Sequence, residues 1–192
     1  IMVLLLAISA PLAVADGVPA GAELTEKNYD TLVVGTTTEM NGNFFHAMWG
    51  NNTSDNDVRA LLHGYGLVGW DGANSSYTIN STAVSGIVVT QDRQGNRTYT
   101  LALYDDLYYS DGTRVTARDY AFSVLLSVAS QAEENGATLN NQNYVLGLEE
   151  YRSGKAKTVS GLHVLSDDVL AVTVKAEYYP YFYELTLLDF YP

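Results

Sequence analysis

The stretch from residue 97 to residue 119 constrains the fold most, because it encodes a strand, a turn and the start of a helix in close succession. Two sets of residues alternate along its first part: Thr98, Thr100 and Ala102 on one side, and Tyr99, Leu101 and Leu103 on the other. This is the period of a half-buried strand. Asp111-Gly112 is a turn dipeptide, since glycine tolerates positive φ and aspartate can bond its own backbone.

A capping box follows the turn. Thr116 begins Thr-Ala-Arg-Asp, in which its hydroxyl can accept a backbone N–H while the Asp119 carboxylate reaches back to the cap. The residues after it share one apolar helical stripe: Ala117, Tyr120, Ala121, Val124, Leu125 and Val128. Turn and cap chemistry fully explain Asp111, Gly112, Thr116 and Asp119, so we interpret them as structural and not catalytic.

Composition narrows the class of protein. The 192 residues are 47% hydrophobic, which is enough for one domain with a full core. The net charge of −12 argues against nucleic acid and anionic membranes as partners, because both are bound mainly through Lys and Arg. The chain has no cysteine and therefore no disulfide, thiolate nucleophile or thiolate metal ligand.

The N-terminal residues predict export. Residues 3–15 form a short apolar run that ends in Ala13-Val14-Ala15, as in the apolar core and cleavage site of a secretory signal peptide. We assign residues 1–15 to a signal peptide whose basic first part is missing, and residues 16–30 to a polar leader. The alternative is a buried N-terminal helix, which Pro11 disfavours.

Several further elements are expected, in chain order. Residues 31–36 form a strand, and a long polar segment with apolar anchors follows from residue 37 to 53. Loops of that length inside a domain are usually functional or disordered. Ser54 and Asp57 predict a second capping box, opening a helix with one apolar face: Val58, Leu61, Leu62 and Tyr65.

The rest of the chain alternates hairpins with polar connections. Residues 84–91 and 97–104 predict one hairpin, and residues 162–164 and 170–174 predict a second. The stretches 71–83 and 130–143 are expected to be polar connections, residues 144–154 a short helix ended by glycine, and Pro180 the first turn of a last helix.

Three motifs carry a family resemblance. They are Tyr-Thr-Leu-x-Leu with Ser-Asp-Gly-Thr-x-Val-Thr-Ala-x-Asp-Tyr-x-Phe-Ser between residues 99 and 123, Val-Ser-Gly-Leu-x-Val with Asp-Asp-x-Leu-x-Val-Thr-Val between 159 and 174, and Pro-Tyr-Phe-x-x-Leu from 180. The sequence thereby resembles the extracellular solute-binding proteins of family 5, the dipeptide-, oligopeptide- and nickel-binding components of bacterial ABC importers.

The resemblance implies a fold and a truncation. The fold would be α+β, a mixed sheet with flanking helices, as part of lobe one of a two-lobed, periplasmic-binding-protein-like (type II) architecture. Members of the family are much longer, so residues 31–192 would be the N-terminal part of lobe one, in a fragment of a larger gene product.

The resemblance also implies a ligand-binding segment. Placing residues 54–65 on the family's first helix puts Trp49, Gly50, Asn51, Asn52 and Thr53 on the stretch that lines the cleft in peptide-binding relatives, with a contribution from Thr38 and Glu39. There the backbone pairs with an extended ligand as an added strand. Trp49 would supply an apolar wall; the alternative is that it anchors the loop to a core.

The implied function is the substrate-binding subunit of an ABC importer, which captures a peptide or similar small solute outside the membrane without chemistry. Its partners would be the solute and the ABC permease subunits; we expect a monomer without cofactor, in the periplasm or at the extracellular cell surface. A secreted hydrolase or a passive cell-surface domain remains the alternative, with functional residues outside this chain. The three histidines lack metal-site spacing, and the adjacent acidic pairs diverge, so no metal or catalytic residue is predicted.

Overall fold

A computed structural model describes residues 34–139, 143–178 and 191–192, and divides the chain into two units, residues 1–36 and 37–192. In the first unit only residues 34–36 are described; they are exposed and are not part of a strand, contrary to the prediction. The predicted signal peptide, the leader, the rest of that strand and most of the helix from Pro180 lie outside the described residues. The elements below all belong to the second unit.

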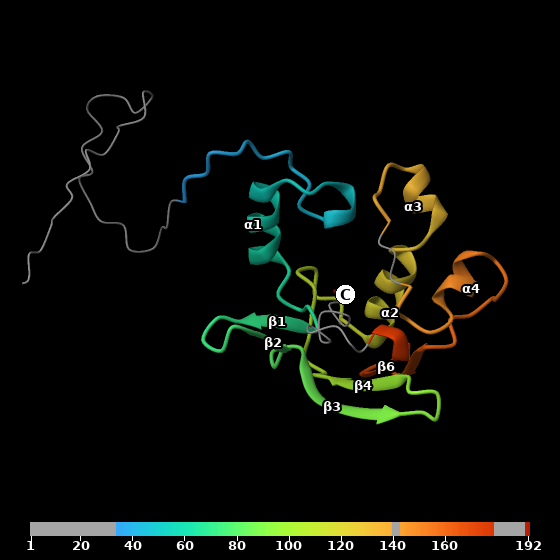
Figure 1. The fold of residues 1–192 in the computed structure, drawn as a ribbon. Helices are drawn as coiled ribbons and strands as arrows, with labels where there is room; N and C mark the ends of the chain where they lie inside the picture. The colour runs from blue at the N-terminus through green and yellow to red at the C-terminus, as the bar shows by residue number, and fades with distance from the viewer. Residues whose placement is uncertain (1–33, 140–142, 179–190) are drawn as a thin grey trace, which may run out of the picture. The chain divides into compact units, whose positions relative to one another are not determined.

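A four-stranded sheet runs along the lower edge of this unit in the view of Figure 1, with the helices above it. Its strands are β3 (Val84–Gln91), β4 (Arg97–Leu103), β6 (Val169–Val174) and β5 (Leu162–Ser166), in that spatial order. Both predicted hairpins are confirmed. Every pairing among the described strands is antiparallel, so a mixed sheet is not found there: tight turns close both hairpins, and β4 and β6 also run antiparallel.

Helix α2 (Ala117–Leu126) packs against β5 and β6, as expected for the apolar stripe. The alternation along β4 is confirmed, since Tyr99, Leu101 and Leu103 are buried while the residues between them are only half-buried. Across the sheet they join the apolar residues of β6, and from α2 the largest contributor is the fully buried Tyr120. Its hydroxyl donates to the carbonyl of Tyr65 at 2.7 Å.

The turn and the cap before α2 form as predicted. The Asp111 carboxylate accepts the N–H of Thr113 at 2.8 Å, and Gly112 has φ +85°. Hydrogen bonding by Thr113 lowers the pKa of the Asp111 carboxyl below its ordinary value. The capping box is complete, because Asp119 accepts the N–H of Thr116 at 2.6 Å while the Thr116 hydroxyl accepts from the first turn.

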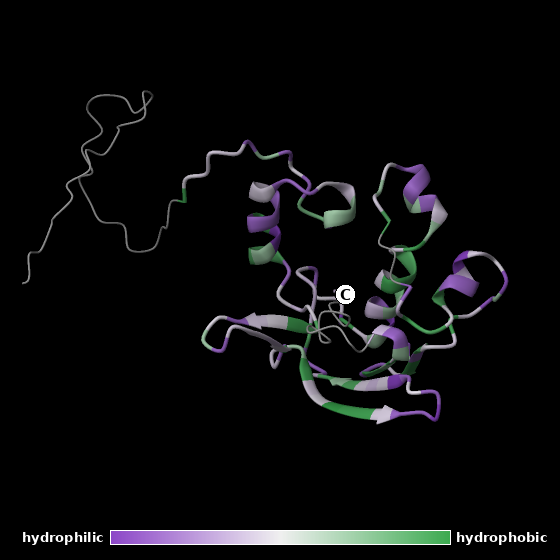
Figure 2. Ribbon diagram, viewed as in Figure 1, coloured by the Kyte–Doolittle hydropathy of each residue, from purple (hydrophilic) through white to green (hydrophobic). Residues whose placement is uncertain are grey.

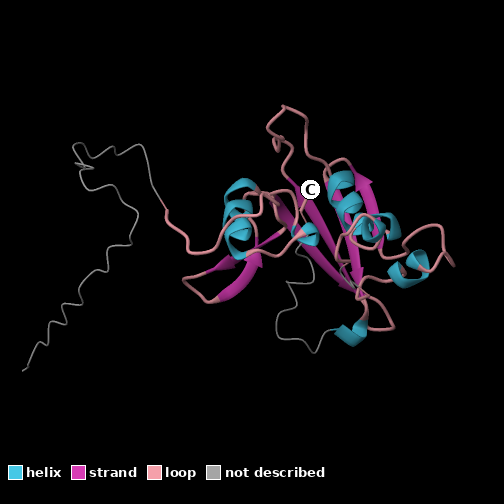
Figure 3. Cartoon of the chain, turned by 90° about the horizontal axis from the view of Figure 1, so that it is seen from above, coloured by secondary structure: helices cyan, strands magenta, loops and turns pink. Residues whose placement is uncertain are grey.

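Three elements lie wholly or partly where only polar connections were expected. Strands β1 (Val68–Asp71) and β2 (Ser76–Ile79) form a separate hairpin, and α3 (Ser130–Glu134) lies within the stretch 130–143. The predicted short helix is confirmed as α4 (Leu148–Arg152), after which Gly154 adopts φ +73°. Short 3₁₀ turns, η1 (Ala47–Trp49) and η2 (Ala176–Tyr178), complete the order (Figure 3). Within the described ranges no helix has the length and apolar character needed to cross a membrane.

Candidate functional site

Helix α1 (Thr53–Leu62) supports the segment singled out by the sequence, and it begins one residue earlier than predicted. Its N-cap is Asn52, whose side-chain oxygen accepts the N–H groups of Ser54 at 2.9 Å and Asp55 at 3.3 Å. The capping box of Ser54 and Asp57 is therefore wrong. Asparagine caps as well as serine, and the Ser54 hydroxyl donates instead to the Thr38 carbonyl at 2.9 Å, while Asp57 is exposed.

The buried face of α1 is also the opposite of the one predicted. Leu61 and Leu62 are 87% and 62% exposed, whereas the polar residues Ser54, Asp55 and Arg59 are buried. Figure 2 shows the same helix as mostly hydrophilic, apart from its C-terminal end. The apolar stripe fails as a guide here because the helix packs against a polar loop, residues 37–52, through hydrogen bonds and not through a hydrophobic core.

Asp55 holds the first part of this loop. Its carboxylate is completely buried and accepts three consecutive backbone N–H groups, from Asn41 at 3.0 Å and from Gly42 and Asn43 at 3.3 Å each. Successive N–H groups that converge on one point form a concave site for an anion. Gly42 adopts φ +82°, a conformation that other residues rarely take, and this lets the chain curl around the carboxylate.

Arg59, one helical turn further on, holds the second part. Its guanidinium donates to the carbonyl oxygens of Asn43 and Gly50, the latter at 3.1 Å, and to the side-chain oxygen of Asn56. The side chain is only 7% exposed. Asp55 and Arg59 thus bond both ends of the segment 41–50 from beneath.

The segment also bonds within itself around η1. The Nδ1 atom of His46 accepts the N–H of Met48 at 3.0 Å, which leaves the neutral ring with its proton on Nε2. Burial, followed by the positive charge of Arg59 and the nearby His63, lowers the pKa of His46 below its ordinary value. The N–H groups of Trp49 and Gly50 bond to carbonyls at 46 and 47 at 3.2 Å each.

The residues predicted to meet a ligand are brought together by these bonds. Glu39 lies beside Asn52, whose side-chain amide donates to the Glu39 carbonyl at 2.9 Å, and Thr38 is joined to the start of α1. Thr38, Glu39, Asn51 and Thr53 are exposed, while Trp49, Gly50 and Asn52 are half-buried. The two stretches, residues 38–39 and 49–53, are therefore joined at the start of α1, and all seven residues are at least partly accessible; we call them the α1 ridge.

Trp49 fits both interpretations left open by the sequence. It packs against a small apolar cluster built on Met48, Ala132 and Ala137, yet part of it remains accessible. The Met48 carbonyl also accepts the N–H of Thr138 at 2.7 Å, which ties η1 to the segment after α3. Gly50 has a packing reason of its own, since a Cβ there would lie 2.6 Å from the Asn43 side-chain amide.

Sequence reasoning missed the residues that shape the ridge: Asn43, His46, Asp55 and Arg59. The one signal available was the spacing of Asp55 and Arg59, four residues apart, which places both side chains on one helix face.

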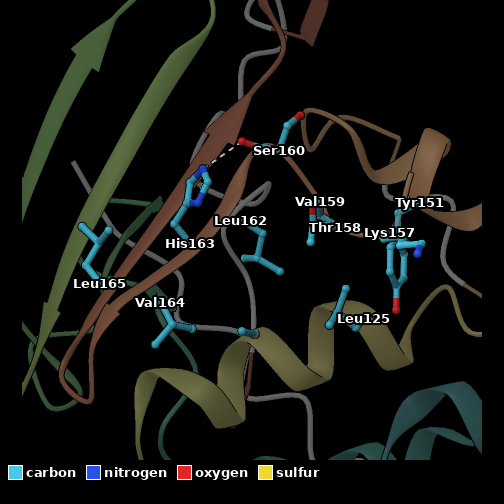
Figure 4. Close-up of a pocket in the computed structure, with 11 residues that line it drawn as sticks. Leu125, Tyr151, Lys157, Thr158, Val159, Ser160, Leu162, His163, Val164 and Leu165 are labelled. Atoms are coloured by element: carbon cyan, nitrogen blue, oxygen red, sulfur yellow. Dashed lines mark hydrogen bonds between the residues drawn. The ribbon is translucent and has the colours of Figure 1, made fainter. Parts of the chain in front are cut away.

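A separate cavity of about 570 Å³ lies between α2, β5 and the loop that follows α4 (Figure 4). Its walls are largely apolar: Leu125, Tyr151, Val159, Leu162 and Val164. His163 faces Ser160 there, with its Nε2 atom 2.8 Å from the Ser160 carbonyl oxygen. No residue of the α1 ridge lines this cavity. Among the described residues, no group of three or more His, Cys, Asp or Glu side chains is arranged to hold a metal ion.

The chain was compared with family models and with individual known proteins. No family model matches the chain, but individual proteins do. It is 31% identical over 175 residues to the periplasmic oligopeptide-binding protein OppA of Escherichia coli (strain K12), covering 91% of this chain and 30% of that protein. It is 36% identical over 89 residues to the oligopeptide-binding protein OppA of Lactococcus lactis subsp. lactis (strain IL1403), covering 46% of this chain and 14% of that protein.

Solved structures agree with the sequence matches. A periplasmic oligopeptide-binding protein from Borrelia burgdorferi matches with a TM-score of 0.59 and 25% identity, over 76% of this chain and 28% of that one. OppA of Listeria monocytogenes, solved bound to peptide, matches with a TM-score of 0.58 over 76% of this chain and 27% of that one; at 20% identity it shows the fold alone.

These matches place the chain in the extracellular solute-binding proteins of family 5, which confirms the resemblance found in the sequence. Within that family it is a homologue of the oligopeptide-binding proteins OppA, and it corresponds to a portion of them. The chain spans 30% of the length of the Escherichia coli relative.

Proposed function

We propose that this chain is the N-terminal part of lobe one of a two-lobed binding protein, the substrate-binding subunit of an ABC importer that captures oligopeptides. The observation that carries the proposal is the 31% identity over 175 residues to a periplasmic oligopeptide-binding protein. The described fold, with its antiparallel sheet and flanking helices, is consistent with a portion of such a protein. The names of the relatives favour a binder without chemistry over a secreted hydrolase or a passive surface domain.

The α1 ridge is the proposed contact with the solute. Trp49 offers an accessible apolar surface with one N–H donor, and the asparagine and threonine side chains offer donors and acceptors suited to peptide groups. The N–H groups of Trp49 and Gly50 are already bonded within the segment. Pairing with the main chain of an extended peptide therefore falls to residues 51–53, whose N–H groups donate to no acceptor in the described part of the chain.

Location and partners follow from the same proposal. The apolar run of residues 3–15 would direct the protein to the periplasm or the extracellular surface, in keeping with the periplasmic relatives. There the loaded protein, as a monomer, would dock on the permease subunits of the importer.

The proposal is tested with the intact protein that the gene encodes. Native mass spectrometry of the protein with an equimolar mixture of synthetic peptides of two to nine residues should select bound species, and calorimetry with the tightest-binding one should give submicromolar, one-to-one binding. Free amino acids are the control. Failure of every peptide to bind would refute the proposed solute class.

Two matched variants locate the contact. Trp49→Ala should weaken binding of the selected peptide at least tenfold, whereas Trp70→Ala should leave the affinity unchanged, because Trp70 lies on β1 and stacks edge-on against Tyr77, 5.0 Å between ring centroids. Equal losses in both variants would contradict the placement on the ridge. The 192-residue chain alone should bind the same peptide far more weakly, since hinge closure uses contacts on both lobes.

A further inference from the structure

Two buried charges lie directly beneath the α1 ridge. Asp55 and Arg59 are 0% and 7% exposed. The Asp55 carboxylate accepts backbone N–H groups of the overlying segment, whereas the Arg59 guanidinium donates to carbonyls of that segment and to Asn56 on its own helix. A charge taken out of water is costly unless it is fully hydrogen-bonded, so such residues are a poor way to gain stability alone.

The bonds instead fix the geometry of one segment. Asp55 accepts three consecutive N–H groups at residues 41–43, and Arg59 donates to the carbonyls of Asn43 and Gly50. Both ends of the segment are therefore held at defined positions on α1. The second end, Gly50, lies between Trp49 and Asn51, which are the residues proposed to face the solute.

We propose that Asp55 and Arg59 are positioning residues for solute capture: they hold the segment 41–50 in the shape that presents the α1 ridge. This rests on the function proposed above. A segment that is already ordered does not lose its conformational freedom when the ligand binds, so more of the contact energy appears as affinity. Loosening the segment should therefore weaken binding, although neither side chain is itself proposed to touch the solute.

The chemistry of the two residues defines informative substitutions. Asp55→Asn keeps the shape but removes the charge that three N–H dipoles converge on. Arg59→Lys keeps the charge but replaces a planar fork by a point charge, which cannot serve separate acceptors at Asn43, Gly50 and Asn56 together. Arg59→Met removes every bond.

The experiment combines hydrogen exchange, followed by mass spectrometry, with calorimetry on the intact protein, using the selected peptide as the probe. Asp55→Asn and Arg59→Met should speed amide exchange across residues 41–50 at least tenfold and weaken peptide binding at least tenfold. Arg59→Lys should fall between Arg59→Met and the wild type in both measurements. Exchange in β4 and β6 should not change.

Matched controls separate this effect from a general loss of charge. Asp57→Asn removes the charge of an exposed residue on the same helix, and Arg118→Met removes an arginine whose side chain is 75% exposed. Both should leave exchange at residues 41–50 and the affinity unchanged.

Each other result decides against the inference. Unchanged exchange at residues 41–50 would show that the bonds do not hold the segment, and faster exchange with unchanged affinity would show that its shape does not matter to the solute. If the wild type binds no peptide, the proposed function fails first and the inference with it. If Arg59→Met raises exchange throughout β4 and β6, the variant has lost stability as a whole, and Arg59→Lys is used in its place. Arg59→Lys supports the inference if it speeds exchange at residues 41–50 and weakens binding together; weaker binding without faster exchange there would show that the role of Arg59 is structural only.

Discussion

Removing the N-cap of α2 should lower stability without touching solute binding. Thr116→Ala deletes the hydroxyl that accepts the N–H of Arg118 at 3.3 Å and donates to the Asp119 carboxylate at 2.8 Å. It leaves the strongest bond of the capping box in place, from the Thr116 N–H to the Asp119 carboxylate at 2.6 Å. The helix would then keep the bond from the Thr116 backbone to Asp119 and lose the bonds made by the Thr116 hydroxyl.

The magnitude follows from which bonds remain. Loss of an N-cap hydroxyl costs roughly 0.5–2 kcal/mol, and because the deleted bond to the helix N–H is long, we expect about 1 kcal/mol for Thr116→Ala. Asp119→Ala should cost about 1–2 kcal/mol, since it removes a charge-assisted bond and a negative charge from the first turn. The double variant should lose less than the sum, because each residue's contribution depends on the other.

Urea unfolding of the intact protein, with circular dichroism as the readout, measures these differences. Thr116→Ser is the matched control and should retain the wild-type midpoint, since serine caps as well as threonine. Calorimetry with the selected peptide should give the same affinity for all variants. An unchanged midpoint with collapsed affinity would mean that Thr116 meets the solute and that its role as a cap is wrong.

Three further changes are expected to act through single physical causes. Leu101→Ala should lower the free energy of unfolding by roughly 2–5 kcal/mol in urea melts, because Leu101 is fully buried in the sheet, whereas Val88→Ala on the neighbouring strand, at 61% exposure, should cost about 0.5 kcal/mol or less. Gly147→Ala should destabilise more than Gly112→Ala in the same melts: both have positive φ, +79° and +85°, but only at Gly147 would a Cβ meet a backbone nitrogen, 2.8 Å away, while Gly112 has open space. Burial and the nearby charge of Arg59 lower the pKa of His46, so as pH falls the unfolded chain takes up this proton first; the contribution of His46 to stability is therefore complete above its ordinary pKa of 6.5 and is lost as pH falls through that value towards the folded pKa. Unfolding measured from pH 5 to 8 should show a smaller pH dependence in His46→Gln, and an identical profile would contradict the lowered pKa of His46.

The correctly predicted parts of the fold depend on short-range signals. In the first hairpin the Asp92 carboxylate accepts the N–H groups of Gln94 and Asn96 at 2.9 Å each, within a turn that the sequence shows directly. The capping box before α2 spans four residues, and the alternation along β4 matches its burial. Such local patterns decide structure by themselves, so the sequence alone predicts them.

The wrong predictions concern elements whose partners are distant or polar. The strands of the hairpin β1–β2 are only four residues long, too short for their alternation of apolar and polar residues to stand out, and Trp70 and Tyr77 on them are 56% and 38% exposed. The apolar stripe of α1 failed because the bonds to the overlying loop join residues 9 to 16 positions apart in the chain. No periodicity within the helix records that loop.

The same contrast explains why the candidate site was only partly found. The family resemblance predicts positions such as Trp49 and Asn51 as ligand contacts, and the structure leaves both at least partly accessible. It does not give Asp55 and Arg59, which look in the sequence like an ordinary surface pair at helical spacing. Only their burial beneath the loop reveals that they bond its backbone. A loop of this length needs residues that define its shape, and in this chain they are polar residues on the helix face that hydrophobic patterning assigned to solvent.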